Sequence, residues 1–426
     1  MGGGLWCVNQ GTTLGGILGH EGGTSRGNGG GHGASPDIPK GSGASTSAPR
    51  SLFITNDFPP RIGGAQSYYW GLIQLLDPSE VVVVAPDQPG GQAFDRTHPY
   101  RVVRYPLQQL GPTRGLLRVA LQLIEDFDVE VVQFGHPLPT GLLGPMLKKR
   151  TGVPYLVFLG GAELTLPGAM PVSGTALRHV LTNAAMMLAV SDYTAKAASR
   201  QVKGTVPAVT MRPAIDGAFN LPLSLDKVQA KGQLGIDGPL VICVGRLIPR
   251  KGQDRLIESL ALLSGAFPDI HLAIVGSGRT AEHLRKLAAS LGVEKRLHLT
   301  GALAMDELKV WMTASDVFAS PCRSRWAGLE VEGFGLVFAE ASLAGLPVLA
   351  GHSGGAPESV KNGETGIVAL GYFKEEVAEA LGRLLSLSPD ARAAMGRRAR
   401  EFTLARHAPE VVAERYREAL TRVAKG

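Results

Sequence analysis

The chain has 426 residues, of which 44% are hydrophobic and 19% charged, so it is long enough and apolar enough to build two cores. The three cysteines, Cys7, Cys243 and Cys322, are odd in number and lack metal-ligand spacing, so neither a disulfide framework nor a zinc site is predicted. The net charge of +6 favours an anionic partner. Because no nucleic-acid-reading motif is present, we expect a membrane surface or a phosphorylated substrate.

The beginning of the chain differs from the rest in composition. Residues 1–50 are dominated by Gly, Ser and Thr without periodic apolar positions, which predicts a disordered extension. No apolar run reaches the roughly 18 residues that a membrane-spanning helix needs, and no basic start followed by an apolar stretch is present. We therefore expect a cytoplasmic protein, at most peripheral on the inner face of the plasma membrane.

From Ser51 onward, short apolar runs alternate with stretches of helical periodicity over 66–76 and 114–127. The apolar runs of the first series are SLFIT, VVVVAP, VEVVQF, PYLVFLG and MMLAVS. Continuous apolar strands between helices are typical of a parallel sheet covered on both faces. This pattern predicts an N-terminal Rossmann-like domain over 51–213.

A second series follows the segment MRPAIDGAFNL at 211–221, whose Pro, Asp, Gly and Asn residues indicate a hinge between domains. Its buried-strand candidates are PLVICVGR, HLAIVG, RLHLTG, DVFASP and LPVLAG. We expect a C-terminal Rossmann-like domain over 214–400 and a helical stretch from Pro389 to Lys425. The fold class is thus α/β with two such domains.

The first informative motif, NDFPPRIGGAQ at 56–66, comes directly after the first strand and before a helix. The pair Gly63 and Gly64 allows backbone N–H groups to approach a phosphate at the positive end of a helix dipole. A plain turn is the alternative, but ligands of open α/β sheets bind at this carboxyl edge.

The second motif, VGRLIPRKG at 244–252, again follows a strand. Arg246 and Lys251 on this short loop can hold a diphosphate. When a sugar nucleotide reacts, negative charge grows on the departing diphosphate, and preorganised cations lower the barrier. For Arg250 we expect an ordinary solvated charge.

The third motif, EGFGLVFAEA at 332–341, contains two glutamates separated by seven residues. Its glycines suit a tight loop that presents N–H groups at a helix N-terminus. If that helix begins near Leu336, Glu340 lies one turn inside and can bind the hydroxyls of a ribose, and Glu332 meets the donor sugar. Glutamates on Ala-rich helices are usually solvated, but the neighbours Phe334 and Phe338 argue against an exposed face.

In this order, the three motifs resemble those of the retaining GT-B glycosyltransferases of family 4. Within that family the chain is similar to the phosphatidylinositol mannoside mannosyltransferases that add an α-1,6-linked mannose from GDP-mannose. The resemblance covers about residues 51–420 and is strongest over 245–254, 275–279, 330–341 and 350–360. It implies two Rossmann-like domains facing each other across a cleft, with the helix of 401–426 packing back on the N-terminal, acceptor-binding domain.

The resemblance also implies roles for single residues. Arg246, Lys251 and Glu332 would form the catalytic set, Glu340 would bind the ribose, and Asp57 and Gln66 would lie toward the acceptor. The other donor-binding residues are expected to be Gly63, Gly64, Gly276, Phe334, Gly335, Leu336 and Val337.

We expect a nucleotide-sugar donor, a glycolipid acceptor at a membrane surface, no nucleic acid and no obligate protein partner. No cofactor and no catalytic metal are expected, because the Asp126-Phe127-Asp128 pattern lies away from any strand's carboxyl edge. Candidates for membrane contact are Arg114 with Arg118 and the basic run 148–150, although such segments are more often ordinary surface.

One departure from the family concerns the segment LGGAE at 159–163. Such enzymes commonly carry a histidine where this chain has Gly160, and that histidine approaches the donor sugar. Glycine has no side chain to bind a hydroxyl, so either a neighbour such as His136 substitutes or the donor sugar differs.

Several other functions share parts of these motifs. Gly276-Ser277-Gly278 fits a loose dinucleotide fingerprint, but the next strand ends in Thr300-Gly301 and not in the acidic residue that such enzymes need. A GT-B-fold epimerase, a non-catalytic sensor, and a family 4 enzyme using a UDP-sugar on another lipid or polysaccharide stay open as alternatives.

Overall fold

The computed structural model describes residues 47–61, 63–165, 168, 170–215 and 226–426. Most of the predicted disordered extension therefore lies outside the described residues. Of the remainder, Ala48 is buried and its N–H donates to Glu80 Oε1 at 2.6 Å. The packed domain therefore includes Ala48, three residues before the expected boundary.

The N-terminal domain is built on a parallel sheet with the strand order β3-β2-β1-β4-β5-β6-β7. The five predicted strands are all present, and each is buried throughout because helices cover both faces. Two further strands, β3 and β7, form the sheet edges. The bounds are β1 Ser51–Ile54, β2 Val81–Pro86, β3 Arg101–Tyr105, β4 Val131–Phe134, β5 Tyr155–Leu159, β6 Met186–Ala189 and β7 Ala208–Thr210.

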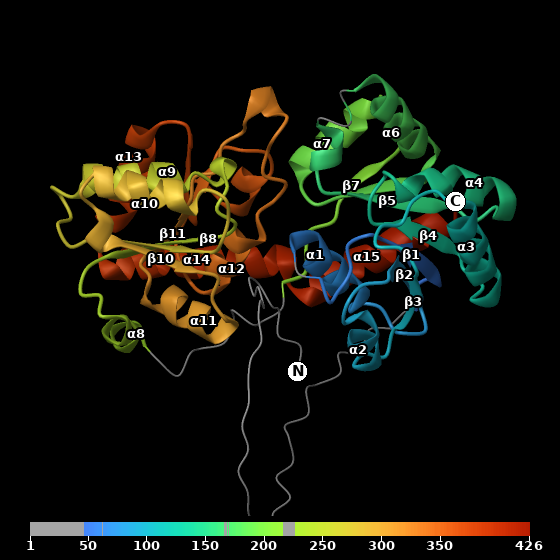
Figure 1. Cartoon of the computed structure of the whole chain (residues 1–426), viewed down its shortest axis with the longest axis horizontal. Helices are drawn as coiled ribbons and strands as arrows, with labels where there is room; N and C mark the ends of the chain where they lie inside the picture. Colours follow the sequence, from blue (N-terminus) through green and yellow to red (C-terminus); the bar gives the residue numbers. More distant parts are fainter. Residues whose placement is uncertain (1–46, 62, 166–167, 169, 216–225) are drawn as a thin grey trace, which may run out of the picture.

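The C-terminal domain repeats this plan with the parallel order β10-β9-β8-β11-β12-β13 (Figure 1). Its five predicted strands are present, and β13 adds an edge. The bounds are β8 Leu240–Val244, β9 His271–Val275, β10 Leu297–Gly301, β11 Val317–Ser320, β12 Val348–Gly351 and β13 Gly366–Ala369.

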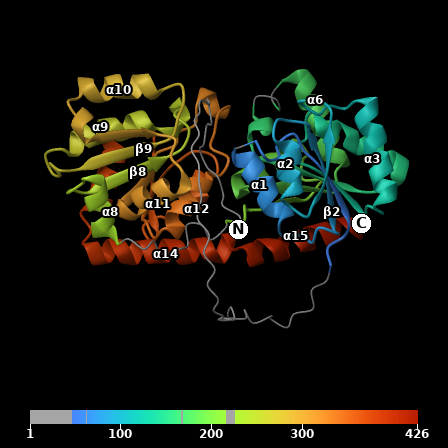
Figure 2. The ribbon, with the colours of Figure 1, turned by 60° about the horizontal axis from the view of Figure 1, so that its bottom comes forward.

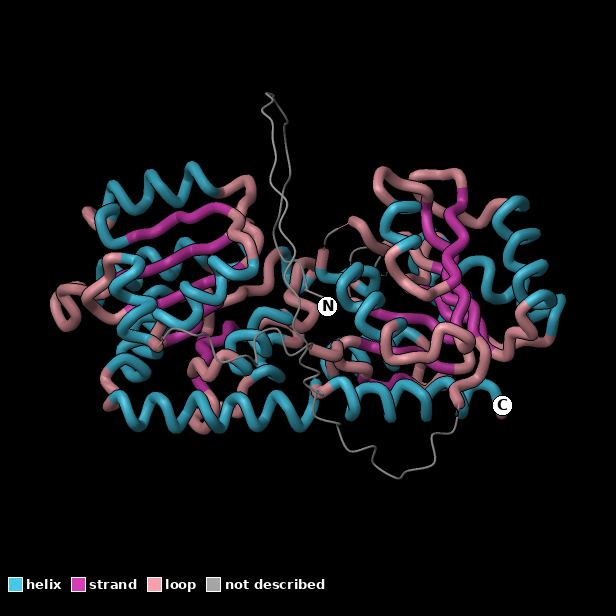
Figure 3. The backbone as a smooth tube through the Cα atoms, turned by 90° about the horizontal axis from the view of Figure 1, so that it is seen from below, coloured by secondary structure: helices cyan, strands magenta, loops and turns pink. Residues whose placement is uncertain are grey.

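Helices flank the strands of both domains, cyan against magenta in Figure 3. In the N-terminal domain they are α1 Gly64–Ile73, α2 Gly91–Arg96, α3 Arg114–Asp126, α4 Gly144–Thr151, α6 Pro171–Asn183 and α7 Asp192–Gln201. In the second domain they are α8 Lys227–Leu234, α9 Gln253–Leu263, α10 Ala281–Ser290, α11 Met305–Ala314, α12 Leu336–Leu343 and α13 Lys374–Leu385. Within the described ranges, none of the helices combines the length and apolar character needed to cross a bilayer.

The C-terminal stretch forms two helices, α14 Pro389–His407 and α15 Pro409–Ala424. Pro409 separates them because its ring disfavours a helical conformation at the preceding residue. Helix α14 packs on α12, whereas α15 packs on α1 and β4 of the first domain. Figure 2 shows the pair running beneath both domains. The return to the N-terminal domain is therefore confirmed, and it begins at Pro409.

Two crossings of the chain between the domains lie side by side. The N–H of Ile215 donates to His407 O at 3.0 Å, and His407 Nδ1 lies 2.9 Å from Pro213 O. The predicted hinge is described only as far as Ile215, and its remainder, 216–225, lies outside the described residues. Loops that follow strands of the two sheets also meet, because a Cβ atom on Gly355, after β12, would lie only 2.7 Å from Ser191, after β6.

Candidate functional site

The loop after β8 is a basic turn in close contact with the loop after β9. Gly276 has φ +140°, and a Cβ atom there would lie 2.1 Å from Gly245 O. The backbones therefore touch at a point where no side chain fits. Behind this contact, the short 3₁₀ turn Pro249–Lys251 directs the Lys251 side chain inward.

Lys251 forms an ion pair with Glu332, with Nζ 2.9 Å from Oε2 and side-chain exposures of only 9% and 8%. Arg250 Nη2 lies 3.6 Å from the same carboxylate oxygen. Burial alone would raise the pKa of Glu332, but Lys251 and Arg250 outweigh it and hold that pKa below its usual value. The carboxylate is therefore ionised at neutral pH, and the cations around it outnumber it.

Helix α12 begins at Leu336, as predicted, after Gly335 with φ +82°. Its residues are apolar almost all round, so the helix is buried and carries Glu340 into the interior. Burial raises the pKa of Glu340 to about 8, against the opposing charge of Lys251. The first N–H groups of a helix have no intrahelical acceptor, so the N-terminus of α12 offers free donors beside the Glu332 cluster.

In the N-terminal domain, α1 begins at Gly64 and is preceded by Gly63. A Cβ atom on Gly63 would lie 2.3 Å from Gln66 Oε1. The glycine therefore leaves room for the Gln66 side chain, which turns back and donates from Nε2 to Asp57 Oδ1 at 2.5 Å.

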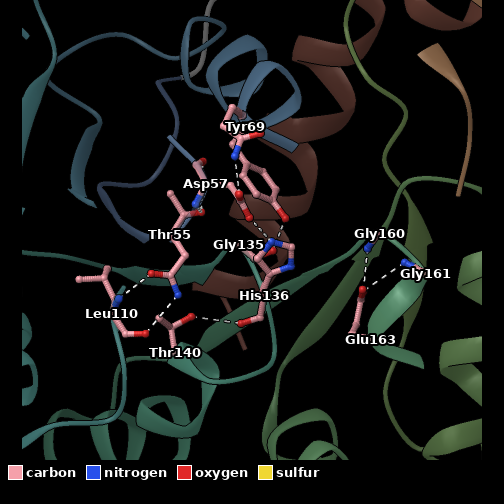
Figure 4. A network of polar contacts seen from close by, with 12 residues as sticks. Thr55, Asp57, Tyr69, Leu110, Gly135, His136, Thr140, Gly160, Gly161 and Glu163 are labelled. Atoms are coloured by element: carbon pink, nitrogen blue, oxygen red, sulfur yellow. Dashed lines mark hydrogen bonds and ion pairs between the residues drawn. The ribbon is translucent and has the colours of Figure 1, made fainter. Parts of the chain in front are cut away.

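The other oxygen of Asp57 binds a histidine at the end of β4 (Figure 4). His136 Nε2 lies 2.6 Å from Asp57 Oδ2, and both side chains are 24% exposed. Burial lowers the pKa of His136, but the hydrogen bond to Asp57 and the charge of Glu163 outweigh it and raise that pKa above its usual value. An anionic partner thus favours the protonated ring.

The turn after β5 brings the two domains into contact. Glu163 Oε1 accepts hydrogen bonds from the N–H groups of Gly160 and Gly161, at 2.7 and 3.2 Å (Figure 4). A Cβ atom on Gly333 would lie only 2.4 Å from Gly160 O. The loop that carries Glu332 therefore lies directly against the N-terminal domain.

Comparison with known proteins assigns this two-domain site to a family. A model described as "Glycosyl transferases group 1" matches residues 226–402, and one described as "Glycosyl transferase 4-like domain" matches residues 63–213. A GDP-mannose-dependent alpha-(1-6)-phosphatidylinositol monomannoside mannosyltransferase of Mycolicibacterium smegmatis is 38% identical over 358 residues, 83% of this chain and 93% of the relative. The chain belongs to the group 1 glycosyl transferases.

Other relatives agree with this assignment. A GDP-mannose-dependent monoacylated alpha-(1-6)-phosphatidylinositol monomannoside mannosyltransferase of Corynebacterium glutamicum is 36% identical over 372 residues, 86% of this chain and 96% of the relative. The crystal structure of Anabaena HepE in complex with UDP has a TM-score of 0.74 at 20% identity and covers 87% of this chain and 99% of that one. The GT-B fold and the nucleotide-sugar-dependent glycosyltransferase class are thus confirmed, and the dinucleotide-dependent alternative is not supported.

Several residues that the sequence singled out in this glycosyltransferase lie together. Lys251, Glu332 and Glu340 share one buried cluster, Gly276 borders the basic loop, and Asp57 and Gln66 are hydrogen-bonded. Arg246 is exposed beside the cluster and contributes to the low pKa of Glu332. Phe334 is buried, with its ring 5.1 Å from that of His407 at the crossing between the domains.

The expectation for Arg250 was wrong. Its side chain is 14% exposed and faces Glu332, because the 3₁₀ turn places residues 250 and 251 against the same carboxylate. Two further contacts were not predicted from the sequence: Cys322 Sγ lies 3.8 Å from Glu332 Oε2, and Glu163 accepts a hydrogen bond from the N–H of Gly160. Only proximity in the fold reveals these contacts.

The Asp126-Phe127-Asp128 pattern lies at the end of α3, away from this site. Asp126 accepts a hydrogen bond from Gln122, and Asp128 forms an exposed ion pair with Arg50. Across the described part of the chain, no group of three or more His, Cys, Asp or Glu side chains has an arrangement suited to a metal ion.

Proposed function

We propose that this glycosyltransferase transfers mannose from GDP-mannose to a phosphatidylinositol mannoside-type glycolipid with retention of anomeric configuration. The observation that carries this proposal is the 36–38% identity to mannosyltransferases of that specificity over 83–86% of the chain. Because the similarity spans both domains, it includes the acceptor side as well as the donor side. A role in phospholipid and glycolipid biosynthesis follows.

The donor's diphosphate is proposed to bind Arg246, Lys251 and the N-terminus of α12. Arg250, whose Nη2 lies 3.6 Å from Glu332 Oε2, is proposed as a third cation for the diphosphate. Lys251 is already held by Glu332, so little ordering of that side chain remains to be done when donor binds. The glycine pair 63–64 would approach the phosphate from the opposite domain, and Gly276 would border the nucleotide.

The other donor contacts follow from α12. The backbone from Phe334 to Val337 would bind the sugar and phosphate, and Glu340, one turn inside the helix, would accept hydrogen bonds from the ribose hydroxyls. Glu332 would orient the sugar. Asp57 and Gln66 would bind the acceptor.

In the transfer step, the bond between the anomeric carbon and the diphosphate breaks, and the electron pair leaves with the diphosphate. The acceptor hydroxyl forms the new bond on the same face, and its proton passes to the departing phosphate oxygen. Arg246, Arg250 and Lys251 stabilise the charge that grows on the leaving group. No catalytic metal enters this proposal.

Contact with the membrane would be electrostatic. The apolar face of α3 is buried in the domain core through Leu116, Ala120 and Leu123, so this helix cannot insert it into lipid. Its basic residues Arg114 and Arg118 lie on the helix that packs beside α4, which carries the basic run 148–150. We therefore propose a peripheral association with anionic lipid.

The test compares GDP-mannose, UDP-glucose and UDP-N-acetylglucosamine as donors to detergent-dispersed phosphatidylinositol monomannoside, with the products measured by mass spectrometry. We expect one added hexose from GDP-mannose alone, with an α linkage by NMR. Transfer from a UDP-sugar would overturn the donor, and turnover without a lipid product would overturn the acceptor.

A further inference from the structure

A hydrogen-bonded cluster of Asp57, Gln66 and His136 lies at the carboxyl edge of the N-terminal sheet. Asp57 follows β1 and His136 follows β4, and these strands are neighbours in the order β2-β1-β4-β5. The chain order reverses between them, and such a switch point is where open α/β sheets bind ligands. Asp57 and His136 therefore stand on either side of the crevice expected there.

The imidazole of His136 is fixed in orientation. Asp57 accepts a hydrogen bond from Nε2, which fixes the plane of the ring. The other ring nitrogen, Nδ1, has no hydrogen-bond partner among the residues that the structure describes. The ring packs edge-on against Tyr69, with 5.7 Å between the ring centroids, and the Tyr69 hydroxyl donates a hydrogen bond to Gly135 O. The His136 side chain is 24% exposed, so a ligand can reach it, and Nδ1 is the ring nitrogen left to bind one.

The surroundings of this nitrogen favour a neutral polyhydroxyl ligand. Asp57 and Glu163 both act on His136, and two carboxylates repel a phosphate. Gly160 contributes no side chain, and a Cβ atom there would come no closer than 3.9 Å to Glu163 Oε2, so space is open beside the carboxylate. Acidic oxygens, a side-chain amide and an imidazole together form the mixture of donors and acceptors that binds hydroxyl groups.

We propose that His136, held by Asp57, is a specificity-determining residue whose Nδ1 binds a hydroxyl group of the acceptor's sugar or inositol ring. This inference rests on the proposed function for the identity of the acceptor. It assigns His136 to the acceptor and not to the donor sugar, because its partner Asp57, and Gln66 bound to the same carboxylate, are the residues proposed to bind the acceptor.

The test measures KM for donor and acceptor and kcat in His136→Ala, with His179→Ala as the control, since His179 is an exposed histidine on α6 of the same domain. We expect KM for phosphatidylinositol monomannoside to rise about tenfold, the effect of one lost hydrogen bond to substrate. KM for the donor should stay within about twofold, and His179→Ala should match wild type. A rise in the donor KM, or no change in either KM, would overturn the inference.

Two further experiments distinguish a loss of acceptor binding from a loss of stability and from a wrong assignment of the acceptor. If His136→Ala lowers the thermal unfolding midpoint too far for assay, His136→Gln replaces it, because glutamine retains a donor for Asp57 but not the Nδ1 position. If wild type does not use the lipid at all, the proposed function fails, and His136 is then tested by saturation-transfer NMR with methyl α-mannoside and myo-inositol. Binding lost in the variant supports the inference, and equal binding or none contradicts it.

Discussion

At the scale of single residues, the site depends on buried charge. Lys251 and Glu332 compensate each other, whereas the carboxyl group of Glu340 is equally buried but has no hydrogen-bond partner among the described residues. A lone carboxyl group in such surroundings retains its proton. Lys251 and Glu332 are therefore ionised before the donor binds, whereas Glu340 is neutral.

This difference predicts a pH effect on stability. Folded Glu340 releases its proton near pH 8, whereas an unfolded chain releases it near 4.5, so the folded state holds one more proton between these values. The free energy of unfolding should therefore fall as pH rises from about 4.5 to 8. Glu340→Gln should flatten this slope in urea titrations at several pH values. An unchanged slope would contradict the proposed burial of a neutral carboxyl group.

The motifs themselves were recognisable from the sequence at this scale, but the contacts between them were not. The start of α12 near Leu336, and with it the position of Glu340 one turn inside the helix, was predicted correctly. The inward direction of the Arg250 side chain was not predicted. On an extended loop, the side chains of residues 250 and 251 would point in opposite directions, but in the 3₁₀ turn both reach the same carboxylate. The functional roles assigned to these residues stay predictions.

At the scale of elements, the central strands were all predictable, whereas of the four edge strands only β10 was predicted. Strands such as β8 are buried on both faces and appear as continuous apolar runs. The edge strands β3, β7 and β13 are short or partly exposed, so RVVRY and AVT carry too weak a pattern to stand out. The helical C-terminal stretch was predicted as a whole, but its division at Pro409 appeared only in the structure.

The contact between the loops after β8 and β9 leads to a matched pair of substitutions. Gly276 and Gly292 both have positive φ, but only Gly276 faces a backbone atom, and a Cβ on Gly292 would meet nothing within 4 Å. Gly292→Ala should lower the free energy of unfolding by about 1 kcal/mol, the cost of left-handed backbone strain. Gly276→Ala should cost about 2–4 kcal/mol, because the loops must also separate.

The measurement is chemical denaturation together with GDP titration. Only Gly276→Ala should weaken GDP binding, since its loop borders the basic turn. Equal losses of stability in the two variants would show that the contact between the loops contributes nothing.

At the scale of the whole molecule, a polar contact joins the two domains beside the site. Glu358 accepts hydrogen bonds from the N–H groups of Asp192 and Tyr193 at the start of α7, at 2.8 and 2.7 Å. Arg212 is almost fully buried, and its Nη2 lies 2.8 Å from Asp192 Oδ2 and 3.5 Å from Glu358 Oε2. A residue of the C-terminal domain therefore caps a helix of the N-terminal domain, which stabilises this arrangement of the two domains.

Removing this cap should loosen the domains. Glu358→Ala should lower the free energy of unfolding by about 1–2 kcal/mol, as loss of a helix cap does, and increase the radius of gyration of the unliganded protein in X-ray scattering. Glu364→Ala is the control, because among the described residues the Glu364 side chain forms only an exposed ion pair with Lys361. An identical radius in both variants would mean that the Glu358 contact does not restrain the domains.

If the buried cations of the C-terminal domain drive sugar transfer, Lys251→Met should lower kcat/KM for GDP-mannose. Methionine keeps most of the aliphatic stem, and Lys286→Met on α10 is the control because that lysine is exposed. We predict a loss of about 100-fold or more for Lys251→Met, the scale expected when one preorganised electrostatic contact to the transition state is removed, and none for the control. A folded Lys251→Met protein with wild-type kcat/KM would show that this buried cation does not drive the transfer.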